Sequence, residues 1–258
     1  METLDNNQKY NKLVEWAASI ANVGTTQLIS LQDPAWSVIA PYIGATVQTI
    51  CSEIGSDIIS RSLSRKEQSR IARAFYYALK KINENEKNNK PFREDSFTKN
   101  DSESFSEASE FLESVLINAQ KEYQEKKVKY LGNLYANSLF TNNFDKHWMF
   151  YFLKLTETLS FRQFCYIALL KEKSKYGLDR KVDIQKDSYA IMRADQRYEL
   201  FLMIAPNIIK GPKEFNANVA FPLEWYNCDW VGERLFELMN LNEIEQEDIA
   251  MYTGFKNK

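Results

Sequence analysis

The scarcity of glycine and proline most restricts how this chain can fold. Its 258 residues include only eight glycines and six prolines, well below the roughly 12% that these two residue types contribute on average. Both types punctuate strands and tight turns, so a chain poor in them has few places where strands could reverse. Hydrophobic residues reach 44% and charged residues 26%, as in ordinary globular proteins. The sequence therefore predicts a mainly α-helical fold.

Apolar residues in the first part of the chain recur at three- and four-residue spacings, which is the period of one helical face. This spacing predicts a first helix over about 6–22. Ser64 and Glu67 have the spacing of a capping box, which predicts a helix from there to about Asn83. The polar stretch 83–104 is expected to be a loop.

Two further capping boxes predict the helices that follow. Ser104-Phe105-Ser106-Glu107 opens the longest helical pattern, over about 105–140, in which Gly132 marks a bend or a close helix crossing. Ser160-Phe161-Arg162-Gln163 opens a helix that we expect to end by Gly177.

The pattern changes in the last part of the chain. A helix is expected near 194–208, followed by two short strands at Val219-Ala220-Phe221 and Glu224-Trp225-Tyr226, and by a helix over Trp230 to Leu241. Helix, helix, hairpin and helix is the order of a winged-helix-like module containing a short β-hairpin. The sequence thus predicts a helical domain over 1–158 and a winged-helix-like α+β domain over 159–258.

The inventory of reactive residues favours a non-enzymatic protein. His147 is the single histidine, and Cys51, Cys165 and Cys228 are far apart, so we expect three buried thiols and no metal site. Phosphate-binding, dinucleotide-binding and hydrolase motifs are absent from the sequence. Glu125-Lys126-Lys127 has the Glu-x-Lys spacing of some metal-dependent nucleases, but such triplets are common on charged helix faces. A pair of catalytic carboxylates leaves no linear trace, and no catalytic residue or cofactor is assigned.

Charge is distributed unevenly, although the whole chain carries a net charge of only −2. Residues 1–60 have a net charge of −4, and residues 61–100 have one of +6. Within this basic block, i+3 and i+4 spacings place several cations on neighbouring turns, where they could follow phosphate groups. The alternative is a solvated helix face paired with acidic side chains of the first sixty residues. The candidate partner-binding or nucleic-acid-binding residues are Arg65, Lys66, Arg70 and Arg73.

The segment 34–60 is a candidate for association or membrane insertion. It belongs to a stretch of 48 residues without a basic side chain, and Trp36 to Cys51 carries no charge. A membrane-spanning helix needs about 20 apolar residues, so a packed or self-associating helix is favoured over conditional insertion. The residues of this segment that form the candidate surface are Ile43, Gly44, Val47, Ile50, Ile54 and Gly55.

Three blocks of the sequence resemble a known family. They are Ser64–Arg73 (SRKEQSRIAR), Glu122–Asn137 (EYQEKKVKYLGNLYAN) and Leu159–Leu170 (LSFRQFCYIALL). These blocks resemble those of bacterial proteins with the layout of the Abi-alpha abortive-infection family. The resemblance implies a bacterial cytoplasmic protein in antiphage defence, and it carries over no catalytic residue.

These observations together predict a non-enzymatic interaction protein that acts through helix-mediated association. The expected partner is a second copy or another protein, and no small-molecule substrate is identified. Two alternatives remain open: a membrane-perturbing effector that uses 34–60, and a nucleic-acid-binding regulator that uses the basic helix 61–81 or the winged-helix-like module.

Overall fold

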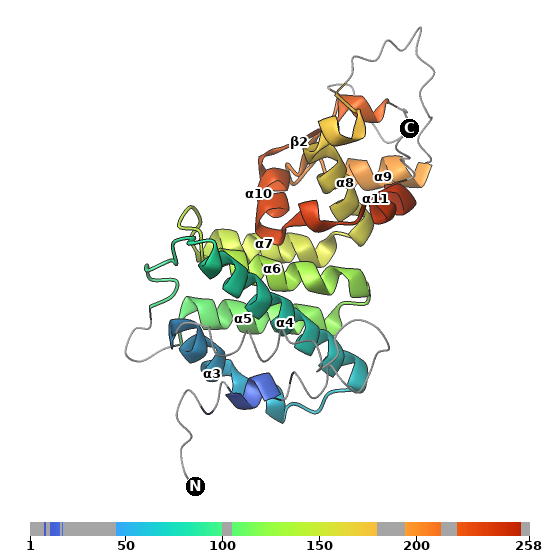
Figure 1. Cartoon of the computed structure of the whole chain (residues 1–258). Helices are drawn as coiled ribbons and strands as arrows, with labels where there is room; N and C mark the ends of the chain where they lie inside the picture. Colours follow the sequence, from blue (N-terminus) through green and yellow to red (C-terminus); the bar gives the residue numbers. More distant parts are fainter. Residues whose placement is uncertain are drawn as a thin grey trace. The chain divides into compact units, whose positions relative to one another are not determined.

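A computed structural model describes residues Gln8, 11–15, Ala17, 45–99, 105–179, 194–212 and 221–253. The chain divides into two compact units, Met1–Thr158 and Leu159–Lys258. The described residues are mainly helical, with one small antiparallel sheet in the second unit (Figure 1). The predicted mainly α-helical class is therefore confirmed.

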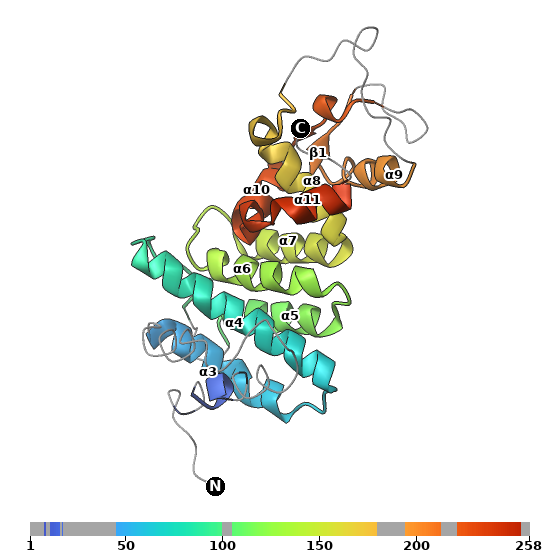
Figure 2. The same ribbon diagram turned by 45° about the vertical axis from the view of Figure 1, so that its right-hand side comes forward.

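Unit 1 is a set of packed helices (Figures 1 and 2). Its elements are α3 (Ala45–Ser60), α4 (Arg65–Lys87), α5 (Glu107–Lys121), the 3₁₀ turn η2 (Glu125–Lys127), α6 (Val128–Ser138) and α7 (Lys146–Thr158). Helix α4 crosses α5 and α6, and α3 packs against α5. Of the helix expected over 6–22, the described residues Gln8, 11–15 and Ala17 are helical. The remaining residues of that segment lie outside the described part.

Helix α4 begins and packs as its sequence predicts. Ser64 is the N-cap, and both hydrogen bonds of the capping box with Glu67 are present. The apolar side chains at three- and four-residue spacing are buried, as Ile71, Phe75 and Leu79 illustrate with exposures of 1–2%. The helix continues four residues beyond the predicted end, to Lys87, before Asn88 caps it.

The capping box makes the stability of unit 1 dependent on pH. The Glu67 carboxylate accepts hydrogen bonds from Ser64 and from Gln120, which lower its pKa from 4.5 to about 2. Stability from a depressed carboxyl pKa is fully present above the unfolded-state pKa and is lost as the pH falls toward the folded-state value. We therefore expect Glu67→Gln to destabilise the protein above pH 4.5 and to have progressively less effect as the pH approaches 2. Urea unfolding at several pH values measures this difference, and Glu94→Gln, at an exposed carboxyl, is the control. A pH-independent difference would contradict the assignment.

The long helix predicted over 105–140 is wrong, because the structure has two helices there. Helix α5 ends at Lys121, the backbone of Glu122 is extended, and α6 begins at Val128. The apolar stripe continues past the break because both helices bury one face against α4. Ser104, the predicted cap, lies outside the described residues, and the N-cap of α5 is Ser106, which accepts from the Ser109 amide.

Gly132 marks a close helix crossing, one of the two roles that the sequence allows. A Cβ atom at this position would lie 2.4 Å from the Ala74 carbonyl oxygen and 2.9 Å from the Ala78 amide nitrogen. Helices α4 and α6 therefore meet backbone to backbone, and only glycine fits between them.

Unit 2 is organised around α8 (Phe161–Lys171), which is buried along most of its length and packs against α10 (Trp230–Met239) and α11 (Gln246–Thr253). The capping box of Ser160 with Gln163 is present, and Gly177 follows with a left-handed backbone. The other elements are η3 (Lys173–Tyr176), α9 (Ala194–Leu202), β1 (Ile209–Lys210), η4 (Leu223–Trp225), β2 (Asn227–Cys228) and η5 (Leu241–Glu243).

The predicted hairpin is present only as a two-stranded antiparallel sheet at other residues. Ile209 pairs with Cys228, and Lys210 pairs with Asn227. The expected strand 224–226 is wrong, since 223–225 form a 3₁₀ turn in which the Tyr226 amide bonds back to Leu223. Val219 and Ala220 lie outside the described residues. Helix α9 ends at Leu202 instead of near 208, because the chain turns there to enter β1.

The three cysteines are free thiols. Cys51 and Cys165 are buried as predicted, whereas Cys228 is only partly buried. Burial raises the pKa of the Cys228 thiol to about 12.

Candidate partner-binding surfaces

The four basic candidate residues of α4 divide into two pairs. Arg65 and Lys66 are exposed in the first turn, and they have no partner among the described residues. Arg70 and Arg73 converge instead on Glu125 of η2: Arg70 Nε lies 2.6 Å from Glu125 Oε1, and Arg73 Nη2 bonds to Glu125 Oε2. Phosphate groups that bind along these residues would have to displace the Glu125 carboxylate from the guanidinium groups of Arg70 and Arg73.

The position of Arg73 also weakens the case for a phosphate surface. Its side chain is only 13% exposed, and that of Arg70 is 16% exposed. Burial lowers the pKa of Arg73, and the nearby Arg70 charge acts in the same direction. The acidic partner comes from η2, and not from the acidic first sixty residues that the sequence suggests. The nucleic-acid role of the four residues stays a prediction.

Of the candidate association segment 34–60, the described helix α3 buries one apolar face in unit 1. Val47, Ile50 and Ile54 of α3 are 1–6% exposed, and the helix packs against α5. Gly55 lies within α3, whereas Ile43 and Gly44 fall outside the described residues. Among the helices of the described ranges, none combines the length and the apolar character needed to cross a membrane.

A buried ion pair occupies the break between α5 and α6. Lys127 Nζ lies 2.6 Å from Glu122 Oε2, with the two side chains 2% and 7% exposed. The Gln124 amide donates to Glu122 Oε1 at 2.8 Å. Glu125 and Lys127, the two ends of the Glu-x-Lys triplet, thus bind different partners. The sequence gives no signal for this pair, because charged residues at a helix break are usually solvated.

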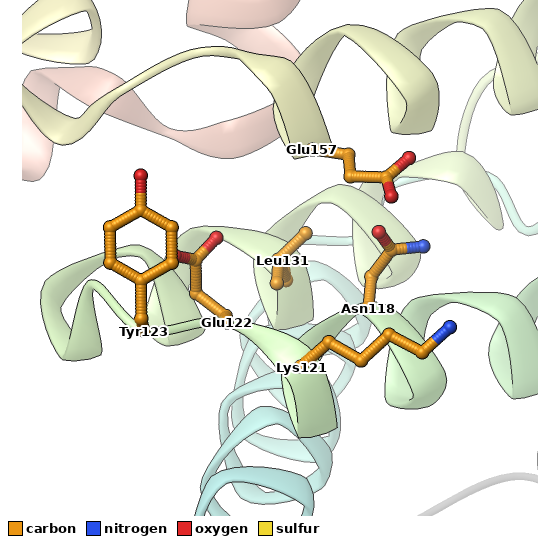
Figure 3. A pocket seen from close by; sticks show the side chains of 6 residues that line it. All are labelled: Asn118, Lys121, Glu122, Tyr123, Leu131 and Glu157. Atoms are coloured by element: carbon orange, nitrogen blue, oxygen red, sulfur yellow. The ribbon is translucent and has the colours of Figure 1, made fainter.

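A small pocket of about 240 Å³ opens beside this break (Figure 3). It lies within unit 1, between the end of α5, the start of α6 and the last turn of α7. Tyr123 is 79% exposed, and Leu131 is buried. The lining residues are Asn118, Lys121, Glu122, Tyr123, Leu131 and Glu157.

Helix α9 carries its exposed apolar side chains on one face. Tyr198, Phe201 and Leu202 are 56%, 43% and 47% exposed, and their i, i+3 and i+4 spacing places them side by side on the helix. The spacing of apolar residues shows that they share a helix face but does not show whether that face is buried or exposed. The sequence therefore does not predict this surface.

Polar groups of α9 bond to α8 and, through Gln196 and the Thr253 carbonyl, to α11. Arg162 Nη1 lies 2.8 Å from Asp195 Oδ2, and Gln163 Nε2 donates to the Glu199 carbonyl at 3.2 Å. Arg197 is partly buried, and its charge opposes the rise in the pKa of Tyr226 that burial causes. The outward face of α9 is therefore more apolar than its composition suggests.

The structure shows no candidate metal centre within the described ranges. No group of three or more His, Cys, Asp or Glu side chains there could hold a metal ion. His147 is exposed in the first turn of α7.

Comparison with protein families, with curated proteins and with solved structures gives no match to this chain.

Proposed function

We propose that this chain is a non-enzymatic bacterial interaction protein that acts through helix-mediated association with a second copy or a protein partner. The observation that carries the proposal is the apolar face of α9, formed by Tyr198, Phe201 and Leu202. We place the protein in the cytoplasm and, following the resemblance of its three sequence blocks to the Abi-alpha layout, in antiphage defence. Unit 2 is proposed to be a winged-helix-like module, with support from its order of helices and strands.

The α9 face has the chemistry of a protein-binding surface. Apolar anchors at i, i+3 and i+4 are the pattern by which one helix packs against another, and aromatic side chains contribute most at such contacts. A helix that reads nucleic acid needs cations directed toward phosphates and bases. On α9 the described charged groups Asp195 and Glu199 are acidic, and Arg197 is partly buried.

Replacing Tyr198 and Phe201 together by serine is expected to weaken association about tenfold or more, because aromatic anchors commonly contribute 1–2 kcal/mol each. Light scattering over a concentration series measures self-association. Cross-linking in the host, followed by mass spectrometry, identifies a partner contacted through α9. Circular dichroism checks that the variant is folded.

Met251→Ser is the matched control, since Met251 of α11 is 65% exposed and also belongs to unit 2. The control variant is expected to associate like the natural chain. A protein that remains monomeric at all concentrations, and whose cross-links do not change on loss of Tyr198 and Phe201, would refute the proposal.

A further inference from the structure

The pocket at the end of α5 contains two hydrogen-bond acceptors that face each other. Asn118 Nδ2 donates to the Ser114 carbonyl at 3.0 Å, which turns Asn118 Oδ1 outward. Figure 3 shows this oxygen directed toward the Glu157 carboxylate. Glu157 Oε2 accepts from Lys154 at 2.8 Å, in a pair that is exposed on both sides. A donor with several N–H groups, such as an ammonium, is the chemical match for these two acceptors.

The last turn of α5 also supplies one cation to the lining of the pocket. Lys121 lines the pocket, is exposed, and has no partner among the described residues. The other carboxylate of the lining, Glu122, is already held by Lys127 and by the Gln124 amide. Glu157 gives only Oε2 to Lys154, in a solvent-exposed pair, so its Oε1 oxygen can still accept from a ligand. The charged groups of the lining that can meet a ligand are therefore the Lys121 ammonium and this oxygen of Glu157.

This balance of charge discriminates between classes of ligand. Lys121 would repel a simple cation, and Glu157 together with Asn118 Oδ1 would repel a simple anion. A molecule that carries both a positive and a negative group can pair with Glu157 and Asn118 Oδ1 through the first and with Lys121 through the second. Leu131 and the ring of Tyr123 supply apolar surface beside them, and the volume of about 240 Å³ suits a molecule below drug size.

We propose that this pocket binds a small zwitterion of the α-amino acid class. Its ammonium lies between Asn118 Oδ1 and the Glu157 carboxylate, and its carboxylate meets Lys121 Nζ. An apolar side chain of the ligand contacts Leu131 and Tyr123. This site is independent of the α9 face, so either proposal can fail without the other.

The test is an NMR titration of the full chain with L-leucine and with two analogues that each lack one charge, 3-methylbutylamine and 4-methylpentanoate. Leucine is expected to shift the amide signals of residues 118–123 and 157. Both analogues are expected to bind at least about tenfold more weakly, because the amine has no group to pair with Lys121 and the carboxylate has none to pair with Glu157.

Lys121→Met and Glu157→Gln are each expected to weaken leucine binding about tenfold, and Lys90→Met, at an exposed lysine away from the lining, to leave it unchanged. Thermal unfolding verifies that all three variants are folded. L-Phenylalanine, L-serine and L-glutamate are titrated in parallel, so that the result does not depend on one side chain. The proposal is overturned if none of the four amino acids shifts these signals at about 10 mM, or if either 3-methylbutylamine or 4-methylpentanoate binds as tightly as leucine.

Discussion

Replacing Gly132 by alanine is expected to lower the free energy of unfolding by about 2 kcal/mol or more. The new methyl group would approach the Ala74 carbonyl oxygen to 2.4 Å and Tyr77 Cβ to 2.9 Å. Alanine is the better helix former by about 1 kcal/mol, but α4 would have to move away from α6 to admit it. Because α4 and α6 bury much of the core of unit 1, the steric cost outweighs the gain in helix propensity. Urea unfolding followed by circular dichroism measures the loss.

Gly177→Ala is the control, because it measures the cost of losing the conformational freedom of glycine without a steric clash. Gly177 has a φ of +66°, and a Cβ there would meet nothing within 4 Å. Its replacement is expected to cost about 1 kcal/mol, from the left-handed backbone alone. If Gly132→Ala proves no more destabilising than Gly177→Ala, the backbone contact between α4 and α6 is not as close as described.

Removing the Lys127 ammonium is expected to have the largest effect of any single charge change, about 3–5 kcal/mol. Lys127→Met would leave the Glu122 carboxylate buried with only the Gln124 amide and no opposite charge. An unpaired buried charge loses its hydration without recovering the Coulomb energy of the pair. The free energy of unfolding from urea titration is again the measurement.

Two further variants make this expectation specific to the ion pair. Lys126→Met, at the exposed neighbouring residue, is expected to change stability by less than about 0.5 kcal/mol. The double variant Glu122→Leu with Lys127→Met is expected to be more stable than Lys127→Met alone, since neither charge is then left unpaired. Equal losses in Lys127→Met and Lys126→Met would show that the pair does not hold the break between α5 and α6.

Local signals in the sequence predict much of the fold. The start and the buried face of α4 follow from Ser64, Glu67 and an apolar stripe, because capping and periodicity are properties of neighbouring residues. The start of α8 at Ser160 follows for the same reason. The close crossing at Gly132 is predicted as one of two alternatives, and the partner helix α4 becomes known only from the structure.

Features decided by distant contacts could not be predicted in this way. The stripe over 105–140 has helical spacing on both sides of Glu122, and the sequence gives no sign that the chain reverses there. The ion pair with Lys127 and the packing of both helices on α4 fix that break. Likewise, pairing with Ile209 and Lys210 determines where the second strand lies. Among the described residues of the two triplets that suggested a hairpin, Phe221 and 224–226 lie outside both strands.

The candidate surfaces were predicted less completely than the helices. The sequence predicts that Arg65, Lys66, Arg70 and Arg73 lie on one helix, and the structure has all four on α4. It does not reveal that Glu125, more than fifty residues away, binds two of them. The exposed face of α9 and the pocket beside Tyr123 depend on which side of each helix the neighbouring elements cover, and periodicity leaves that undecided.

The free cysteines have a practical consequence for work on this protein. A thiol reacts with maleimides as its thiolate, and the natural chain offers two buried thiols and one whose pKa is raised to about 12. Near neutral pH these three groups are slow nucleophiles. A single cysteine introduced at Leu202 could therefore carry a fluorescent label on the α9 face without removal of any native cysteine, and the emission of that label would report directly on what approaches the face.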